Sequence, residues 1–169
     1  MIMSLGVTNS GKSYTLFGGY DEHGQKIDGI IPMTLKQIFK DDTEIHISLF
    51  EIFDKTNIDL LESNKLELPA KRIAPLKGSY LRKSQNISEI KINSLDHGLN
   101  MIEKGISRRK TQSTSWNQVS SRSHAFIQLR LTNTSDSNKM ESSILFVDMA
   151  GDEKVARDKN VLVDRAKEG

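Results

Sequence analysis

The chain has 169 residues, enough for one domain with a sizeable core. Its 36% hydrophobic and 27% charged residues exclude a disordered chain, and the lack of Cys excludes disulfides and Cys-based metal sites. The formal net charge of +2 does not by itself indicate nucleic acid or an anionic membrane as a partner, and no stretch approaches the roughly 18 apolar residues of a membrane span, so a cytosolic protein is the default expectation.

The first third of the chain reads as strand, loop, helix and strand. Residues 1–5 are apolar and run into Gly6, as expected for a buried strand that ends at a phosphate loop. The elements expected next are a helix over 11–17, an exposed loop over 18–29, a short helix starting at Pro32 and a strand over 45–53. Because apolar and polar residues alternate in that last strand, we expect one of its faces to be wet.

The rest of the chain alternates between regular elements and polar segments. Pro69, Pro75 and Gly78 interrupt residues 54–86, where we expect short strands and loops. The elements expected after them are a strand over 87–92, a helix from Leu95 to near Gly105, a functional loop over 108–123, a strand over 125–131, a polar turn over 132–142 and a strand over 143–148. The last is continuously apolar, which is typical of the centre of a sheet.

A glycine-rich loop carries the clearest chemical signal. The complete Walker A pattern is present as Gly6, Val7, Thr8, Asn9, Ser10, Gly11, Lys12 and Ser13. In such a loop the backbone amides curl around phosphates, the Lys neutralises the terminal phosphates and the hydroxyl reaches Mg²⁺. The alternative is a strand-to-helix turn without a ligand. The expected strand before the loop and helix after it favour phosphate binding.

A second motif lies at residues 146–151. It has the form of a Walker B element, in which an apolar strand delivers Asp148 toward Mg²⁺ and leaves the Gly151 amide free to meet a γ-phosphate. The alternative is a core strand that ends in a turn with an exposed acid. The Walker A match upstream favours the functional interpretation.

A third constellation precedes the strand at 125–131. Ser120 and Ser121 offer hydroxyls that would approach Mg²⁺ and the attacking water, and Arg122 would pair with an acid; Asn117 and His124 complete the pattern. A hydroxyl-rich loop with no ligand explains the same residues equally well.

Together, the three motifs resemble the nucleotide site of the kinesin motor family. Residues 6–18 resemble its phosphate loop, 117–124 its first switch and 148–153 its second switch; further matches are at 29–32, at 51–61 and at Arg108, Arg109 and Thr111. The resemblance implies an α/β fold, an incomplete three-layer P-loop NTPase with a mixed central sheet flanked by helices. Residues 1–169 would be a partial motor domain that starts at the end of the third strand and stops after the second switch.

The resemblance also implies binding roles. Nucleotide-binding residues would be Gly6, Val7, Thr8, Asn9, Ser10, Gly11, Lys12, Ser13 and Asn117. Mg²⁺ would be held by Ser13 and Ser121, and by Asp148 through a water.

The catalytic roles that it implies fall on the two switches. Ser120 would position the lytic water, Ser121 would lie by the γ-phosphate, and Gly151 would sense it. Arg122 would form a switch-to-switch ion pair with Glu153 that closes the site and couples the phosphate state to motion.

Two residues depart from the family's second switch, which usually reads DLAGSE. Met149 replaces Leu and conserves its volume, so we expect it to be tolerated. Asp152 replaces Ser and adds a negative charge beside a polyanion, which we expect to weaken nucleotide binding or to slow turnover.

The implied function is that of a microtubule-based motor ATPase with ATP and Mg²⁺ as cofactors and microtubules as partner, acting in the cytoplasm on the cytoskeleton, with the spindle as a candidate site. No nucleic acid or membrane partner is expected, and the main microtubule-binding helix and the dimerisation region are expected to lie outside this chain. The TNSGK form leans toward the kinesin-6 branch. Two alternatives stay open: a truncated or degenerate kinesin-like binding module without motor activity, and an unrelated phosphate-loop enzyme such as a small-molecule kinase, against which the two switch motifs argue.

Overall fold

A seven-stranded sheet forms the centre of the computed structural model, which describes residues 1–53, 56–61, 68–69, 87–115, 122–135 and 140–152. Its strands are β1 (Ile2–Ser4), β4 (Thr43–Phe53), β5 (Thr56–Asp59), β6 (Leu68–Pro69), β7 (Ile90–Lys91), β8 (His124–Asn133) and β9 (Glu141–Asp148). The strand order is β1-β9-β8-β4-β5-β6, and β7 also pairs with β4. β1 is parallel to β9 while the other pairs are antiparallel, so the sheet is mixed as expected.

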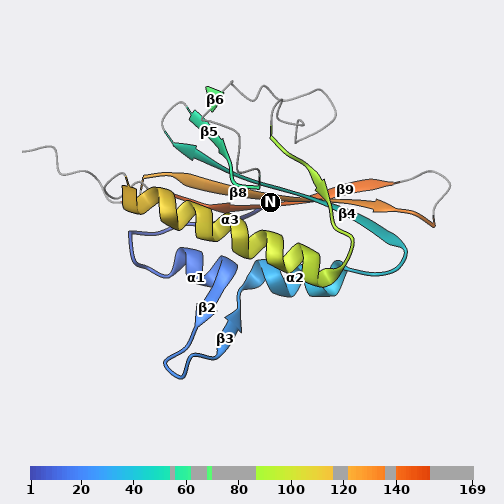
Figure 1. Ribbon diagram of the computed structural model, residues 1–169, viewed down its shortest axis with the longest axis horizontal. Helices are drawn as coiled ribbons and strands as arrows, with labels where there is room; N and C mark the ends of the chain where they lie inside the picture. Colours follow the sequence, from blue (N-terminus) through green and yellow to red (C-terminus); the bar gives the residue numbers. More distant parts are fainter. Residues whose placement is uncertain (54–55, 62–67, 70–86, 116–121, 136–139, 153–169) are drawn as a thin grey trace, which may run out of the picture.

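Three helices cover one face of this sheet. They are α1 (Lys12–Phe17), α2 (Ile30–Ile38) and α3 (Leu95–Ser115), and Figure 1 shows all three on the same side. The part of the chain that the structure describes thus contains the sheet and one of the two helical layers of the expected three-layer fold. In that part, no helix is long and apolar enough to cross a membrane.

The core lies between the helices and the two longest strands. β4 and β8 pair over ten residues, and their helix-facing positions carry apolar side chains that are fully buried, including Ile45, Ile47, Leu49, Ile127 and Leu129. The opposite face of β4 is not the wet face that the alternation predicts, because Ser48 and Phe50 are buried there as well. Phe50 stacks on Phe126 of β8 with the ring centroids 5.0 Å apart, which is close aromatic packing rather than hydration.

The first strand differs from its prediction in burial. β1 is formed as expected, but Ile2 and Met3 are 40% and 41% exposed. The reason is its place at the edge, since among the described residues β1 pairs with β9 alone.

The segment expected as an exposed loop over 18–29 forms a hairpin instead. β2 (Gly18–Tyr20) and β3 (Lys26–Asp28) pair antiparallel, and the carboxylate of Asp21 accepts the amides of His23 and Gln25 in the turn. Lys26 forms an ion pair with Glu103 of α3, and this hydrogen bond raises the pKa of the Lys26 ammonium above its usual value. The hairpin follows α1 directly (Figure 1), and this ion pair ties it to α3.

Both longer helices extend beyond their predicted limits. α2 begins at Ile30, before Pro32, which fits there because the first turn of a helix needs no intrahelical donor. α3 does not end near Gly105 but continues to Ser115, so part of the segment expected as a functional loop is helical. Gly105 is needed for packing rather than for a helix stop, because a Cβ on it would lie 2.7 Å from Cδ2 of the buried Leu49.

Replacing Gly105 by Val should therefore destabilise the fold by about 1–3 kcal/mol, because the core around Leu49 would be overpacked. Equilibrium denaturation with urea measures the change, and Lys104→Ala on the exposed side of the same helix is the control. A variant as stable as the control would mean that α3 does not pack so closely on β4.

The remaining elements agree with the predictions. α1, β8 and β9 lie where the sequence places them, and β5 and β6 are two of the short strands expected within 54–86. The strand expected over 87–92 forms only at β7 (Ile90–Lys91). The polar turn is shorter than expected, since β8 extends to Asn133 and β9 begins at Glu141.

Surface ion pairs join neighbouring segments of the sheet at a distance from the glycine-rich loop. Lys91 of β7 contacts Glu44 of β4 at 2.6 Å, and this hydrogen bond lowers the pKa of the Glu44 carboxyl below its usual value. Arg130 of β8 contacts both carboxylate oxygens of Glu89, at 2.7 and 3.0 Å. Such exposed or half-exposed pairs contribute little to stability individually.

Candidate functional site

The glycine-rich loop connects β1 to α1 with a backbone that favours glycine. Gly6 and Gly11 have φ values of 147° and 87°, and Asn9, at 64°, is a residue type that tolerates the left-handed region. The Lys12 ammonium donates to the carbonyl oxygens of Gly6 at 2.9 Å and Val7 at 2.7 Å. The loop therefore curls around its own lysine and holds that positive charge at the start of α1.

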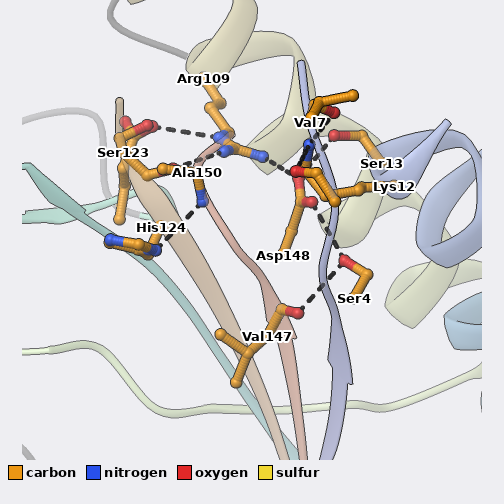
Figure 2. A network of polar contacts seen from close by, with 12 residues as sticks. Ser4, Val7, Lys12, Ser13, Arg109, Ser123, His124, Val147, Asp148 and Ala150 are labelled. Atoms are coloured by element: carbon orange, nitrogen blue, oxygen red, sulfur yellow. Dashed lines mark hydrogen bonds and ion pairs between the residues drawn. The ribbon is translucent and has the colours of Figure 1, made fainter. Parts of the chain in front are cut away.

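Asp148 lies beside this loop because β9 runs parallel to β1. The register places Ser4 opposite Asp148, at the carboxyl ends of both strands. The Asp148 carboxylate accepts hydrogen bonds from Ser13 Oγ at 2.6 Å and from Ser4 Oγ at 3.3 Å (Figure 2). The sheet thus brings together the Walker A serine and the Walker B acid, which are 135 residues apart in the chain.

The Asp148 Oδ2 atom, which accepts from Ser13, also accepts from a buried cation to which the motifs assign no role. Arg109 of α3 is 7% exposed, and its Nη1 donates to Asp148 Oδ2. Its Nε donates to Glu51 Oε1 at 3.1 Å and its Nη2 to the Ser123 carbonyl at 3.2 Å. Figure 2 shows the guanidinium between Ser123 and Asp148.

Arg109 matches the family pattern within a segment expected to be a loop, and the motifs assign no role to Glu51. The available signal was the position of Glu51, which follows Ile45, Ile47 and Leu49 on the helix-facing side of β4. A carboxylate in an apolar series needs a buried partner, so this position indicates a buried cation nearby.

Backbone contacts hold the end of the second motif against its neighbours. The Asp152 amide donates to the Gly6 carbonyl at 3.2 Å, and the Ala150 amide donates to His124 Nδ1 at 3.1 Å. Residues 149–152 are therefore linked both to the phosphate loop and to the start of β8. The Asp152 side chain is exposed, so its charge is free to meet solvent.

The structure describes some of the expected site residues and not others. Gly6 to Ser13, Asp148 and Gly151 come together at the carboxyl end of the β1–β9 pair, whereas the described Arg122 is exposed. Four of the expected residues lie outside the described part of the chain: Asn117, Ser120, Ser121 and Glu153. The Arg122–Glu153 ion pair and the roles of both serines stay predictions.

The donor set fits a hard cation bound together with a phosphate. Mg²⁺ takes oxygen ligands, usually one or two from the protein, with waters and substrate phosphates completing its shell. Ser13 Oγ and the Asp148 carboxylate are such oxygens, and Lys12 supplies the adjacent positive charge. Within the described ranges, no cluster of three or more His, Cys, Asp or Glu side chains forms a metal site made by protein groups alone.

A strand, a phosphate loop with its lysine, a helix and a parallel strand that ends in an acid define a P-loop nucleoside triphosphatase. Comparison with known proteins narrows the class. The family profile described as the kinesin motor domain matches residues 1–169, and the chain belongs to this family.

Similarity to several kinesins agrees with this assignment. The chain is 32% identical to the kinesin-like protein KIN-8B of Arabidopsis thaliana over 94% of this chain and 20% of that protein. It is 33% identical to the kinesin-like protein KIN-6 of the same plant, over 97% of this chain and 17% of that protein. With the kinesin-1 heavy chain of Homo sapiens it shares 32% identity over 98% of this chain and 18% of that protein. These matches do not confirm the lean toward kinesin-6.

The fold is likewise that of a solved kinesin. The structure of a fast kinesin superposes with a TM-score of 0.68 at 23% identity, covering 98% of this chain and 49% of the solved chain. The chain thus spans about half of that structure and about a fifth of the relatives named above.

Proposed function

We propose that this chain binds ATP with Mg²⁺ and forms the nucleotide-binding part of a microtubule-based motor ATPase. The observation that carries the proposal is the 2.6 Å hydrogen bond from Ser13 to Asp148, which joins the two elements that hold magnesium and phosphate in P-loop enzymes. Membership of the kinesin family supports the motor assignment.

The site residues that the structure describes each have a role in this proposal. Bound Mg²⁺ would supply charge neutralisation on the phosphate oxygens. Lys12 would add a second positive charge, while Ser13 and Asp148 would hold the metal through oxygen atoms. The Gly151 amide, held beside the phosphate loop through the Asp152–Gly6 contact, would donate to the terminal phosphate. Catalysis would be positioning and electrostatics rather than covalent chemistry.

The switch roles belong to the same proposal. Ser120 and Ser121 would contact the lytic water, the γ-phosphate and Mg²⁺, with Asn117 beside the nucleotide, and Arg122 would pair with Glu153. Microtubules would be the partner of the whole motor, acting on the cytoskeleton in the cytoplasm. The chain spans about half of the solved kinesin, so the motor activity is proposed for the whole motor rather than for these 169 residues alone.

Titration calorimetry of the chain with ATP tests the proposal. ATP should bind with 1:1 stoichiometry, and more tightly with Mg²⁺ than with a chelator, because the oxygens of Ser13 and Asp148 contribute only when the metal is present. A chain that binds no ATP under either condition would contradict the proposal and favour the alternative of a degenerate kinesin-like interaction module.

A further inference from the structure

A buried carboxylate on β4 contacts the motif at 117–124 directly and the motif at 146–151 through Arg109. Glu51 is 1% exposed and lies on the side of β4 that faces α3. Its Oε1 accepts a hydrogen bond from Arg109 Nε at 3.1 Å and another from the hydroxyl of Ser123. Arg109 comes from α3 and Ser123 directly precedes β8, so one oxygen atom joins three elements.

The contact with Arg109 controls the direction of the guanidinium. This group is planar and rigid, so a hydrogen bond at Nε fixes where its other two nitrogens point. With Nε on Glu51, Nη1 reaches Asp148 and Nη2 reaches the Ser123 carbonyl. Glu51 thereby influences Asp148 without touching it.

Charge gives Glu51 a second effect on Asp148. One guanidinium is shared between two buried carboxylates, and Asp148 also accepts from Ser13. Without the negative charge of Glu51, Arg109 would interact more strongly with Asp148 and would leave uncompensated positive charge beside the metal position. Both changes oppose the binding of a cation by Asp148 and Ser13.

The contact with Ser123 extends this influence to the first switch motif. Ser123 is fully buried and is held at two points, through its hydroxyl by Glu51 and through its carbonyl by Arg109. It directly follows Arg122 in the motif at 117–124. Glu51 therefore anchors the point where this motif enters β8.

We propose that Glu51 is a positioning residue for magnesium-dependent nucleotide binding, acting through Arg109 on Asp148 and through Ser123 on the first switch motif. The inference rests on the proposed function. A purely structural Glu51 would contribute to the stability of the fold without favouring the metal-bound nucleotide over the metal-free one. The ratio of the two affinities separates these possibilities.

The test measures ADP affinity of the chain in Mg²⁺ and in chelator, by titration of a fluorescent ADP analogue. For Glu51→Gln, the ratio of the affinity in Mg²⁺ to that in chelator should fall by about tenfold, the scale seen when residues that orient metal ligands are changed. The affinity in chelator should stay within about twofold of wild type, because the Lys12 loop does not contact Glu51. Glu44→Gln makes the same chemical change on the same strand, where the carboxylate pairs with Lys91, and should leave the ratio unchanged.

Ser123→Ala provides an independent variant, because it removes one contact of Glu51 without leaving a buried charge unpaired. It should lower the ratio in the same direction, and it decides the question if Glu51→Gln does not fold. An unchanged ratio in a folded variant, or equal losses with and without Mg²⁺, would refute the role of Glu51. If wild type binds nucleotide in neither condition, the proposed function fails, and this inference fails with it.

Discussion

Lys12→Ala should weaken ATP binding by about 100-fold, which corresponds to about 2.7 kcal/mol. The ammonium already lies within 2.9 Å of two carbonyl oxygens of the loop, so its charge is fixed at the place where phosphates are expected to bind. Hydrogen bonds to charged groups contribute about 1.5–3 kcal/mol each, and the alanine variant would lose at least one. Equilibrium titration of both proteins with ATP in Mg²⁺ measures the difference.

The control for this variant is Lys40→Ala, which removes the same charge from an exposed position after α2. It should bind ATP as wild type does, so that a loss in Lys12→Ala cannot be assigned to net charge. The fold should survive in both variants, since Lys12 packs at the protein surface and is only half-buried. Equal ATP affinity in wild type and Lys12→Ala would overturn the assignment of the phosphate loop.

The parts of the site that the sequence predicts are those whose signal is local. The Walker A pattern needs only eight consecutive residues, and the strand ending at Asp148 is continuously apolar. β1 and β9 pair as parallel strands, and parallel strands end at the same edge of a sheet. Both motifs therefore lie at that edge. Local pattern is therefore sufficient for Lys12, Ser13 and Asp148.

The parts that the sequence did not predict depend on packing between distant segments. Glu51 and Arg109 are 58 residues apart, and their contact exists because α3 continues past Gly105 and crosses β4. A glycine after an apolar helical pattern is typical of a helix end, whereas here its lack of a side chain lets α3 approach Leu49. The local pattern therefore predicted a helix end at Gly105, whereas the glycine is explained by the close packing of α3 on β4.

The hairpin formed by β2 and β3 also depends on a distant contact, and the sequence predicts a loop there instead. Its strands have three residues each, which is too short for an alternation of apolar and polar side chains to stand out, so the segment resembles a loop. What holds it is the turn at Asp21 and the ion pair between Lys26 and Glu103, a partner 77 residues away. Polar contacts of this kind leave no periodic pattern in the sequence.

Arg109→Met should destabilise the fold by about 3–5 kcal/mol, because it leaves two buried carboxylates without their shared cation. Glu51 and Asp148 are each 1% exposed, and both contact the same guanidinium. Methionine keeps the aliphatic bulk of the arginine stem, so the loss reports the charge rather than a cavity. Urea denaturation gives the free energy of unfolding, and Arg108→Met is the neighbouring control.

Arg108 lies next to Arg109 on α3, but its Nη1 donates to the uncharged carbonyl of Leu60 at 2.8 Å. Its replacement removes one hydrogen bond from a charged group and leaves no carboxylate unpaired, so it should cost less, about 1.5–3 kcal/mol. Equal losses in the two variants would mean that the carboxylates do not depend on Arg109 for compensation.

A double variant identifies the origin of the loss. Adding Glu51→Gln to Arg109→Met removes one of the two uncompensated charges, so the pair should be more stable than the sum of the single losses by about 1–3 kcal/mol. Additive losses would show that Glu51 and Arg109 act independently. A positive coupling would instead show that Glu51 and Arg109 compensate each other, so that β4 and α3 are joined by buried charge as well as by apolar packing.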